Sequence, residues 1–196
     1  MCSGPSVASV PECKFIFLRH GETAYNREGR FQGHINVPLN RTGLAQAELA
    51  AGLLADRQIS RIVSSPARRV LQTVRPFINA SEVPLHIEDD LMEFFVGGFE
   101  GRSFASIRQE TGLREGESWL SVLPDDAECW NGFVSRVCSA VAHWTTEYSD
   151  ETILIASHGL VFGALAEVLT GTRLSSQNAK PHHFRPVGDS WAVSVI

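Results

Sequence analysis

Strand-like and helix-like patterns of apolar residues alternate along most of this chain. Short apolar runs typical of buried strands occur at residues 15–18, 61–63 and 152–156. Each is followed, directly or after a loop, by a segment in which apolar side chains recur every three or four residues, the spacing of an amphipathic helix. Strands alternating with helices predict an α/β fold: a three-layer sandwich whose mainly parallel central sheet is covered on both faces.

Four segments have the helical spacing. The first starts at Thr42, and the second begins with Pro66, which suits a first helical turn because the N–H that proline lacks has no partner there. The third covers residues 129–148 and the fourth residues 160–169. The expected apolar stripes are Leu44, Ala47, Ala51 and Leu54 in the first helix, Leu71 and Val74 in the second, and Trp130, Phe133, Val137, Val141 and Trp144 in the third.

The remaining segments have weaker patterns. Residues 85–87 look like another strand, while the acidic, glycine-rich segment 88–101 has no helical period, so we expect a loop there. One short helix is expected within residues 103–126. Two closing strands are expected around residues 183–185 and 191–196.

Composition narrows the class of protein. The chain has 196 residues, of which 43% are hydrophobic and 20% charged, enough for one compact domain with a full core. Its net charge of −5 disfavours a nucleic-acid partner, which would need clustered Lys and Arg. No apolar stretch approaches the length of a membrane span. Residues 1–12 contain Ser, Pro and Gly without the pattern of a secretory signal, which predicts a flexible tail before a single domain over residues 13–196.

Cysteine usage points to a reducing compartment. Cys2, Cys13, Cys129 and Cys138 form neither a C-x-x-C pair nor a dense framework. A zinc site and a disulfide scaffold are therefore poorly supported. We expect reduced thiols and a cytoplasmic protein. The oligomeric state stays open between a monomer and a homodimer.

Two of the strand-like runs end on the same dipeptide, His20-Gly21 and His158-Gly159. A single histidine at a strand end is more often structural than catalytic. In an open α/β sheet, however, ligands bind beyond the carboxyl ends of the strands, so the repetition predicts two imidazoles in one pocket. Glycine after each histidine lets backbone N–H groups approach an anion. Arg19 precedes His20, and its guanidinium suits a phosphate or carboxylate.

Further motifs follow in an order that resembles a known family, the histidine phosphatase superfamily, also called phosphoglycerate mutase-like. The resemblance covers most of the chain and suggests the small phosphatase branch that includes α-ribazole phosphatase. Besides Ser157-His158-Gly159, the matching elements are Arg19-His20-Gly21-Glu22-Thr23 with Asn26, Gly29-Arg30-Phe31-Gln32-Gly33, Pro38-Leu39, Thr42-Gly43, Ser64-Ser65-Pro66 with Arg69, and the loop of Glu93.

The resemblance implies a chemical role for each matching residue. His20 would be the nucleophile that becomes a phosphohistidine, while Arg19, Arg69 and His158 would bind the phosphoryl oxygens. Attack needs one nitrogen of His20 unprotonated and the other held as a donor, for instance by a backbone carbonyl. His158 is expected to be more useful as a cation. A cationic pocket of this kind stabilises the transition state of phosphoryl transfer.

A leaving alkoxide also needs a proton. The resemblance implies that Glu93 supplies it, with Glu100 as the rival, and a carboxyl near a phosphate should have a raised pKa. Further positions that match the phosphate pocket or the substrate-contacting rim of the family are Thr23, Asn26, Gln32, Gly33 and Gly159.

Four features depart from the pattern or stay open. Ala127-Glu128-Cys129 replaces a Gly-Glu-Ser segment, which leaves the role of Glu128 in doubt. Phe99 stands where Trp is common, and Gly163 ends a triplet where many members have Arg. His182 and His183 could touch the substrate but are more often surface or supporting groups.

The leading hypothesis is a metal-independent phosphomonoesterase without a cofactor, acting on a small phosphorylated metabolite. Nucleic-acid and membrane partners are not expected. Three alternatives remain: a phosphoglycerate mutase, a phosphoprotein phosphatase, and a non-catalytic phosphate-binding module. We expect hydrolysis over transfer because the chain is short and ends on an apolar strand, without the longer insertion and tail that generally accompany mutases.

Overall fold

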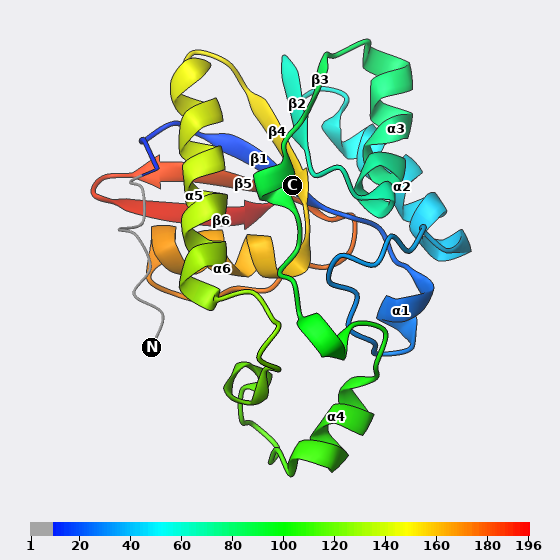
Figure 1. The fold of residues 1–196 in the computed structure, drawn as a ribbon. Helices are drawn as coiled ribbons and strands as arrows, with labels where there is room; N and C mark the ends of the chain where they lie inside the picture. Colours follow the sequence, from blue (N-terminus) through cyan, green and yellow to red (C-terminus); the bar gives the residue numbers. More distant parts are fainter. Residues whose placement is uncertain (1–9) are drawn as a thin grey trace.

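A six-stranded mixed sheet forms the centre of the molecule, and the computed structural model describes residues 10–196 of the chain (Figure 1). The strand order is β3-β2-β4-β1-β5-β6. Strands β1 to β4 are mutually parallel, whereas β5 and β6 form an antiparallel hairpin added beside β1. The bounds are β1 Phe15–Arg19, β2 Arg61–Ser64, β3 Leu85–Ile87, β4 Ile153–Ser157, β5 Pro181–Val187 and β6 Ser190–Val195.

Helices cover both faces of the sheet, so the expected three-layer α/β fold is confirmed (Figure 1). Helices α2 (Arg41–Leu54) and α3 (Arg68–Ser81) pack on one face, and α5 (Trp130–Glu147) and α6 (Gly159–Thr170) on the other. Two short helices, α1 (Ala24–Arg27) and α4 (Phe104–Thr111), lie outside these layers. The 3₁₀ helices are η1 (Asp89–Leu91), η2 (Gly97–Phe99) and η3 (Trp119–Val122).

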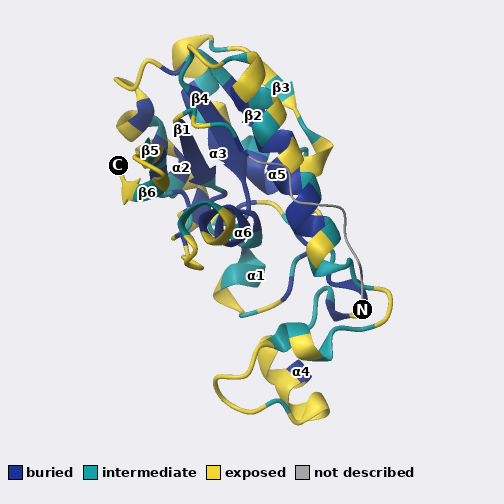
Figure 2. Cartoon of the chain, turned by 90° about the vertical axis from the view of Figure 1, so that its left-hand side faces the viewer, coloured by how far each residue is buried: buried dark blue, intermediate teal, exposed yellow. Residues whose placement is uncertain are grey.

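The alternation of side chains along β1 divides the core in two. Phe15 and Phe17 point toward α5 and α6, whereas Ile16 and Leu18 point toward α2 and α3. This is the period of two that a strand imposes, and both sets are buried because both faces carry helices. Figure 2 shows the consequence, a dark buried sheet between partly exposed helices.

Helix α2 differs in detail from its expected stripe. Its N-cap is Asn40, whose side chain accepts from the Gly43 N–H at 2.8 Å, so the helix begins before Thr42. A Cβ on Gly43 would lie only 2.1 Å from the Glu22 carbonyl oxygen, so this glycine must face the Glu22 backbone. Its neighbour Leu44 is thereby turned outward and is 47% exposed, and the prediction that Leu44 is buried was wrong.

Helix α3 begins at Arg68, two residues after the expected Pro66. Ala67 is the N-cap and has extended backbone angles without a side-chain cap of its own. The cap comes from far along the chain, because the Asn36 side chain accepts from the Arg68 N–H at 2.8 Å. A long-range cap of this kind leaves no local sequence signal.

The remaining segments agree with the sequence in broad terms. The loop after β3 contains the short turns η1 and η2, and α4 is followed by η3, where one short helix was expected. Together α4 and η3 project from the body near the carboxyl edge of the parallel strands (Figure 1). The predicted tail lies mostly outside the described residues. Val10 is described, and it is buried in the part of the core that also contains side chains of α5 and α6. None of the helices among residues 10–196 has the length and apolar character needed to cross a membrane.

Candidate active site

The carboxyl ends of β1 and β4 bring the two His-Gly pairs together. These strands are adjacent and in register, with Arg19 opposite Ser157, so His20 and His158 follow at the same edge. Their ring centroids are 5.4 Å apart, and both side chains are buried. The geometry therefore confirms that the two imidazoles lie side by side, although only His20 lines the cavity.

A backbone carbonyl fixes the ring of His20. Its Nδ1 lies 2.8 Å from the Gly21 carbonyl oxygen, and because a carbonyl can only accept, Nδ1 carries the proton. Burial lowers the pKa of His20 well below 6.5, and the charges of Arg69 and Arg19 lower it further. The ring is thus neutral at physiological pH, with the lone pair on Nε2.

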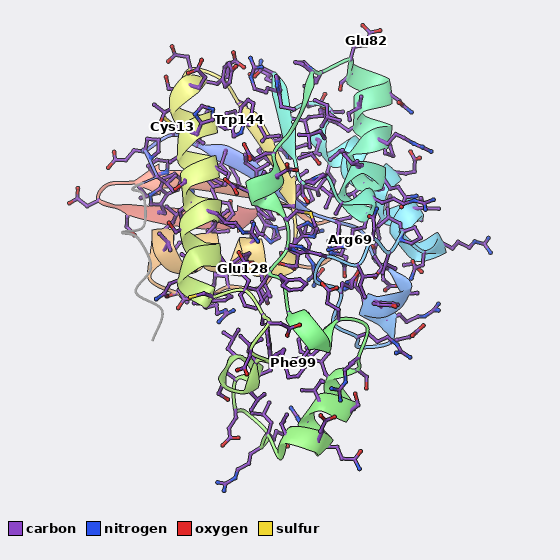
Figure 3. All side chains as sticks on the ribbon, viewed as in Figure 1. Cys13, Arg69, Glu82, Phe99, Glu128 and Trp144 are labelled. Carbon is purple, nitrogen blue, oxygen red and sulfur yellow. The ribbon has the colours of Figure 1, made fainter. Side chains whose placement is uncertain are left out.

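Two arginines lie beside this ring and are anchored on backbone carbonyls. Arg19 donates to the Ser176 carbonyl oxygen at 2.6 Å. Arg69 donates to the carbonyl oxygens of Gly33 and Ile35, each at 2.8 Å. Burial lowers the pKa of both, that of Arg69 to about 10, so both stay charged at neutral pH. Figure 3 labels Arg69 at the side of the sheet covered by α2 and α3.

Each arginine keeps a buried Nε–H without a partner in the described structure. The Nδ1 atom of His158 and the hydroxyl of Ser176 are unpartnered in the same way. Buried polar groups are nearly always hydrogen-bonded, so unpaired donors gathered at one sheet edge are suited to an oxyanion. Two of these four groups, Arg19 and Arg69, carry a positive charge.

The sequence expectation that His158 is more useful as a cation concerns the site with phosphate bound. Burial lowers the pKa of His158 well below 6.5, and the charges of Arg69 and Arg19 lower it further, so the ring is neutral in this structure. Its Nε2 lies 2.8 Å from the Ser65 hydroxyl. In the tautomer in which Ser65 donates, Nδ1 of the neutral ring still offers an N–H.

Glu93, in the loop after β3, lines a cavity that is also lined by His20 and Arg19. Its carboxylate accepts from the Phe94 N–H at 3.1 Å and from the Leu160 N–H at 3.3 Å, in the first turn of α6. Burial raises the pKa of Glu93, while the charges of Arg69 and Arg19 and these two N–H groups oppose the rise. The pKa of Glu93 is thus raised by burial alone, before any phosphate is bound.

Glu100, the rival of Glu93, is occupied by the backbone. Its carboxylate accepts from the His34 N–H and lies directly against Gly33, where a Cβ would overlap it. Gly33 also has a φ of +48°, which favours glycine. Glu100 therefore supports the Gly33 turn.

The cavity has a volume of about 570 Å³, far larger than a phosphate group requires. Of the expected rim residues, four line it: Asn26, Gln32, Gly33 and Gly159. Thr23 does not, because it is fully buried as the N-cap of α1 and donates to Gln32 at 2.9 Å. Arg19, His20 and Glu93 also line the cavity, and Arg69 and His158 are buried without lining it.

Several lining groups were missed by sequence reasoning. Five of these groups form an aromatic wall of the cavity: Tyr25, Phe31, Phe94, Phe104 and Trp119. Phe31 lies at the centre of this wall: its ring centroid is 4.0 Å from that of Phe104 and 5.0 Å from that of Trp119. Phe104 and Trp119 come from α4 and η3, the segment with the weakest sequence pattern.

The open positions receive structural explanations. Glu128 forms an ion pair with Arg136 at 2.7 Å. Gly163 lines the cavity, and so does Arg173, from the loop after α6. His182 bonds to the Lys180 carbonyl oxygen, and neither it nor His183 lines the cavity. Phe99 packs against Phe31; Figure 3 labels it between the body and α4.

Within residues 10–196, no group of three or more His, Cys, Asp or Glu side chains is arranged to hold a metal ion. The donors described above are those of an anion site.

Comparison with known proteins identifies the family. The family model for the histidine phosphatase superfamily (branch 1) matches residues 15–192. The adenosylcobalamin/alpha-ribazole phosphatase of Salmonella typhimurium is 29% identical, over 91% of this chain and 88% of that protein. A glucosyl-3-phosphoglycerate phosphatase of Mycolicibacterium vanbaalenii is also 29% identical, over 81% and 74%. The crystal structure of the alpha-ribazole phosphatase from Shigella flexneri is similar with a TM-score of 0.80 at 26% identity, over 93% and 95%. The resemblance found in the sequence is confirmed, and the chain belongs to the histidine phosphatase superfamily, branch 1.

Proposed function

We propose that this protein hydrolyses phosphomonoesters of small metabolites through a phosphohistidine on His20. The observation that carries the proposal is a neutral, carbonyl-oriented His20 surrounded by buried donors that lack partners. A neutral imidazole supplies the lone pair for attack, and the unpaired donors match the oxygens of a phosphoryl group.

In the first step, Nε2 of His20 attacks phosphorus while the bond to the ester oxygen breaks. The protonated carboxyl of Glu93 gives its proton to the departing oxygen. Arg19, Arg69 and His158 hold the three remaining oxygens, whose charge is spread in the transition state. In the second step, water attacks phosphorus, Glu93 takes the proton of that water, and the P–N bond breaks to release phosphate.

In this proposal, the leaving group of the natural substrate is considerably larger than glycerol. A cavity of about 570 Å³ with an aromatic wall favours a leaving group with an apolar or planar part. The relatives named alpha-ribazole phosphatase and glucosyl-3-phosphoglycerate phosphatase act on phosphorylated small molecules by their names, which supports the same class for this chain. A panel of phosphorylated metabolites, scored by kcat/KM, will identify the member.

The covalent intermediate is the direct test. We expect an acid-labile phosphoryl group on His20 when the protein is quenched during turnover and examined by mass spectrometry. His20→Ala should abolish both the label and the hydrolysis of an aryl phosphate, and added chelator should leave hydrolysis by the unaltered protein intact. An active His20→Ala variant, or turnover without label on His20, would contradict the proposal.

Phosphoryl transfer between phosphoglycerates is the second candidate, since a mutase uses the same kind of phosphohistidine. We propose hydrolysis as the main outcome. Incubation with 3-phosphoglycerate should release inorganic phosphate or nothing, with little 2-phosphoglycerate. Rapid interconversion would favour the mutase.

A further inference from the structure

Three backbone carbonyls at and just before Glu93 are bonded by one side chain. The Arg136 guanidinium donates to the carbonyl oxygens of Asp90 at 2.6 Å, Met92 at 2.8 Å and Glu93 at 3.2 Å. Arg136 comes from α5, more than forty positions away in the sequence. A loop without regular pairing is thus held by a rigid planar group.

The same guanidinium is fixed in orientation by Glu128. Its Nε donates to one carboxylate oxygen of Glu128 at 2.7 Å and its second terminal nitrogen to the other at 2.9 Å. Such a two-point pair sets the plane of the guanidinium as well as its place. The Glu128 carboxylate also accepts from the Phe95 N–H at 3.2 Å, so the pair holds the loop on both sides of Glu93.

Two further side chains hold the loop. Ser157, at the end of β4, donates to the Leu91 carbonyl oxygen at 2.7 Å. His34 donates from Nε2 to the Glu93 carbonyl oxygen at 2.9 Å. Every carbonyl from Asp90 to Glu93 therefore has a side-chain donor, although neither Arg136 nor Glu128 lines the cavity. Figure 3 labels Glu128 where α5 begins, beside this loop.

We propose that Arg136 and Glu128 are positioning residues that hold the carboxyl of Glu93 at the leaving-group side of the cavity. The inference rests on the proposed function, in which Glu93 is the proton donor. Protonation of a departing oxygen needs the carboxyl within hydrogen-bonding distance, and a displacement of about 1 Å can cost a large factor in rate. Fixing the backbone at Glu93 limits such displacement.

The experiment compares two substrates that differ in their need for a proton. The leaving group of p-nitrophenyl phosphate departs without one, whereas the alkoxide of β-glycerophosphate requires one. We expect Arg136→Ala to lower kcat/KM on β-glycerophosphate about tenfold more than on p-nitrophenyl phosphate, a fraction of the full contribution of a general acid. The quantity compared is kcat/KM because it reports the steps up to loss of the leaving group, whereas kcat also includes hydrolysis of the phosphohistidine, in which Glu93 acts with either substrate. The kcat/KM for p-nitrophenyl phosphate should change little, because the donors to phosphate are untouched.

Arg136→Lys separates placement from charge. Lysine keeps the positive charge but cannot span three carbonyls and two carboxylate oxygens. We expect Arg136→Lys to lose activity on β-glycerophosphate in preference to p-nitrophenyl phosphate, as Arg136→Ala does. Glu128→Gln removes one charged acceptor. It should change the ratio of the rates on the two substrates in the same direction as Arg136→Ala, but by less. These two variants decide the question if Arg136→Ala does not fold.

Arg61→Ala is the matched control. Arg61 forms a similar partly buried pair, with Glu151 at 3.2 Å, but does not touch the Glu93 loop. Its removal should lower Tm without changing the ratio of the two rates. If Arg136→Lys and Glu128→Gln also leave the ratio unchanged while Glu93→Gln changes it, the positioning role is wrong and the proposed function stands. If Glu93→Gln itself leaves the ratio unchanged, Glu93 is not the acid, and both proposals fail on that point.

Discussion

The carbonyl oxygen of Gly21 lies 2.8 Å from Nδ1 of His20, so the residue after the histidine determines which nitrogen is free to attack. Gly21 itself has no room for a side chain, because a Cβ would lie 2.7 Å from the Gly43 carbonyl oxygen. The backbone at the start of α2 therefore holds the turn that orients the imidazole. This relationship connects the packing of α2 to the chemistry of His20.

Gly21→Ala should consequently damage catalysis. The new methyl group must displace the Gly21 turn, and the His20 ring moves with the carbonyl that orients it. We expect kcat for an aryl phosphate to fall about 100-fold, the scale of a displacement near 1 Å. Steady-state kinetics measure the effect, and Gly52→Ala, where the added Cβ meets nothing within 4 Å, is the control. Unchanged kcat in Gly21→Ala would show that the carbonyl does not govern the ring.

The pH profile of kcat/KM should have limbs set by Glu93 and His20. The raised pKa of Glu93 means that the protonated acid persists above pH 4.5, and activity should fall as pH rises through its pKa in the folded protein. The lowered pKa of His20 places the acidic limb below pH 6.5. Glu93→Gln should remove the basic limb for β-glycerophosphate while the acidic limb stays. A basic limb retained in full would assign it to another group.

Stability should depend on pH through the two buried histidines. Both pKa values are lowered in the folded protein from 6.5, so the unfolded chain binds more protons below that pH. The free energy of unfolding that the two neutral rings contribute is fully present above pH 6.5. It is lost as pH falls below that value, by about 1.4 kcal/mol per pH unit for each histidine.

Urea unfolding at pH 7.5 and pH 5.5 measures this loss. In a protein with both His20→Asn and His158→Asn, the free energy of unfolding should fall less between the two pH values than in the unaltered chain. His143→Asn, at an exposed position of α5, is the control for the substitution itself. Equal losses in all three proteins would exclude the buried pair as the source.

Sequence reasoning succeeded where the signal is local. The runs that became β1 and β4 each end on His-Gly, and parallel neighbours must bring such ends together, so the pairing of His20 with His158 could be anticipated. The spacing in residues 129–148 likewise predicted α5 to within one residue at each end. These features depend on patterns within a single element.

The parts that were missed depend on contacts between distant segments. The carbonyls bonded by Arg136 lie more than forty positions before it, and backbone acceptors leave no trace in side-chain identity. Leu44 was assigned to the core because the close approach of Gly43 to Glu22 cannot be read from α2 alone. The expectation of a cationic His158 referred to the phosphate-bound site, whereas in the ligand-free protein burial and the neighbouring arginines favour the neutral ring.

Ser65 should be needed for phosphate recognition through His158. Its hydroxyl lies 2.8 Å from Nε2, and Ser65→Ala leaves that nitrogen without its partner. Loss of one buried hydrogen bond costs about 1 kcal/mol, so the inhibition constant of vanadate should rise about fivefold, with a similar rise in KM for p-nitrophenyl phosphate. Vanadate is a suitable probe because it imitates the five-coordinate transition state. Ser64→Ala is the matched control, since Ser64 is equally buried but donates to the Ser65 carbonyl oxygen at 2.9 Å and does not contact His158. Equal weakening by both variants would mean that loosening of the strand end, and not the bond to His158, governs phosphate binding.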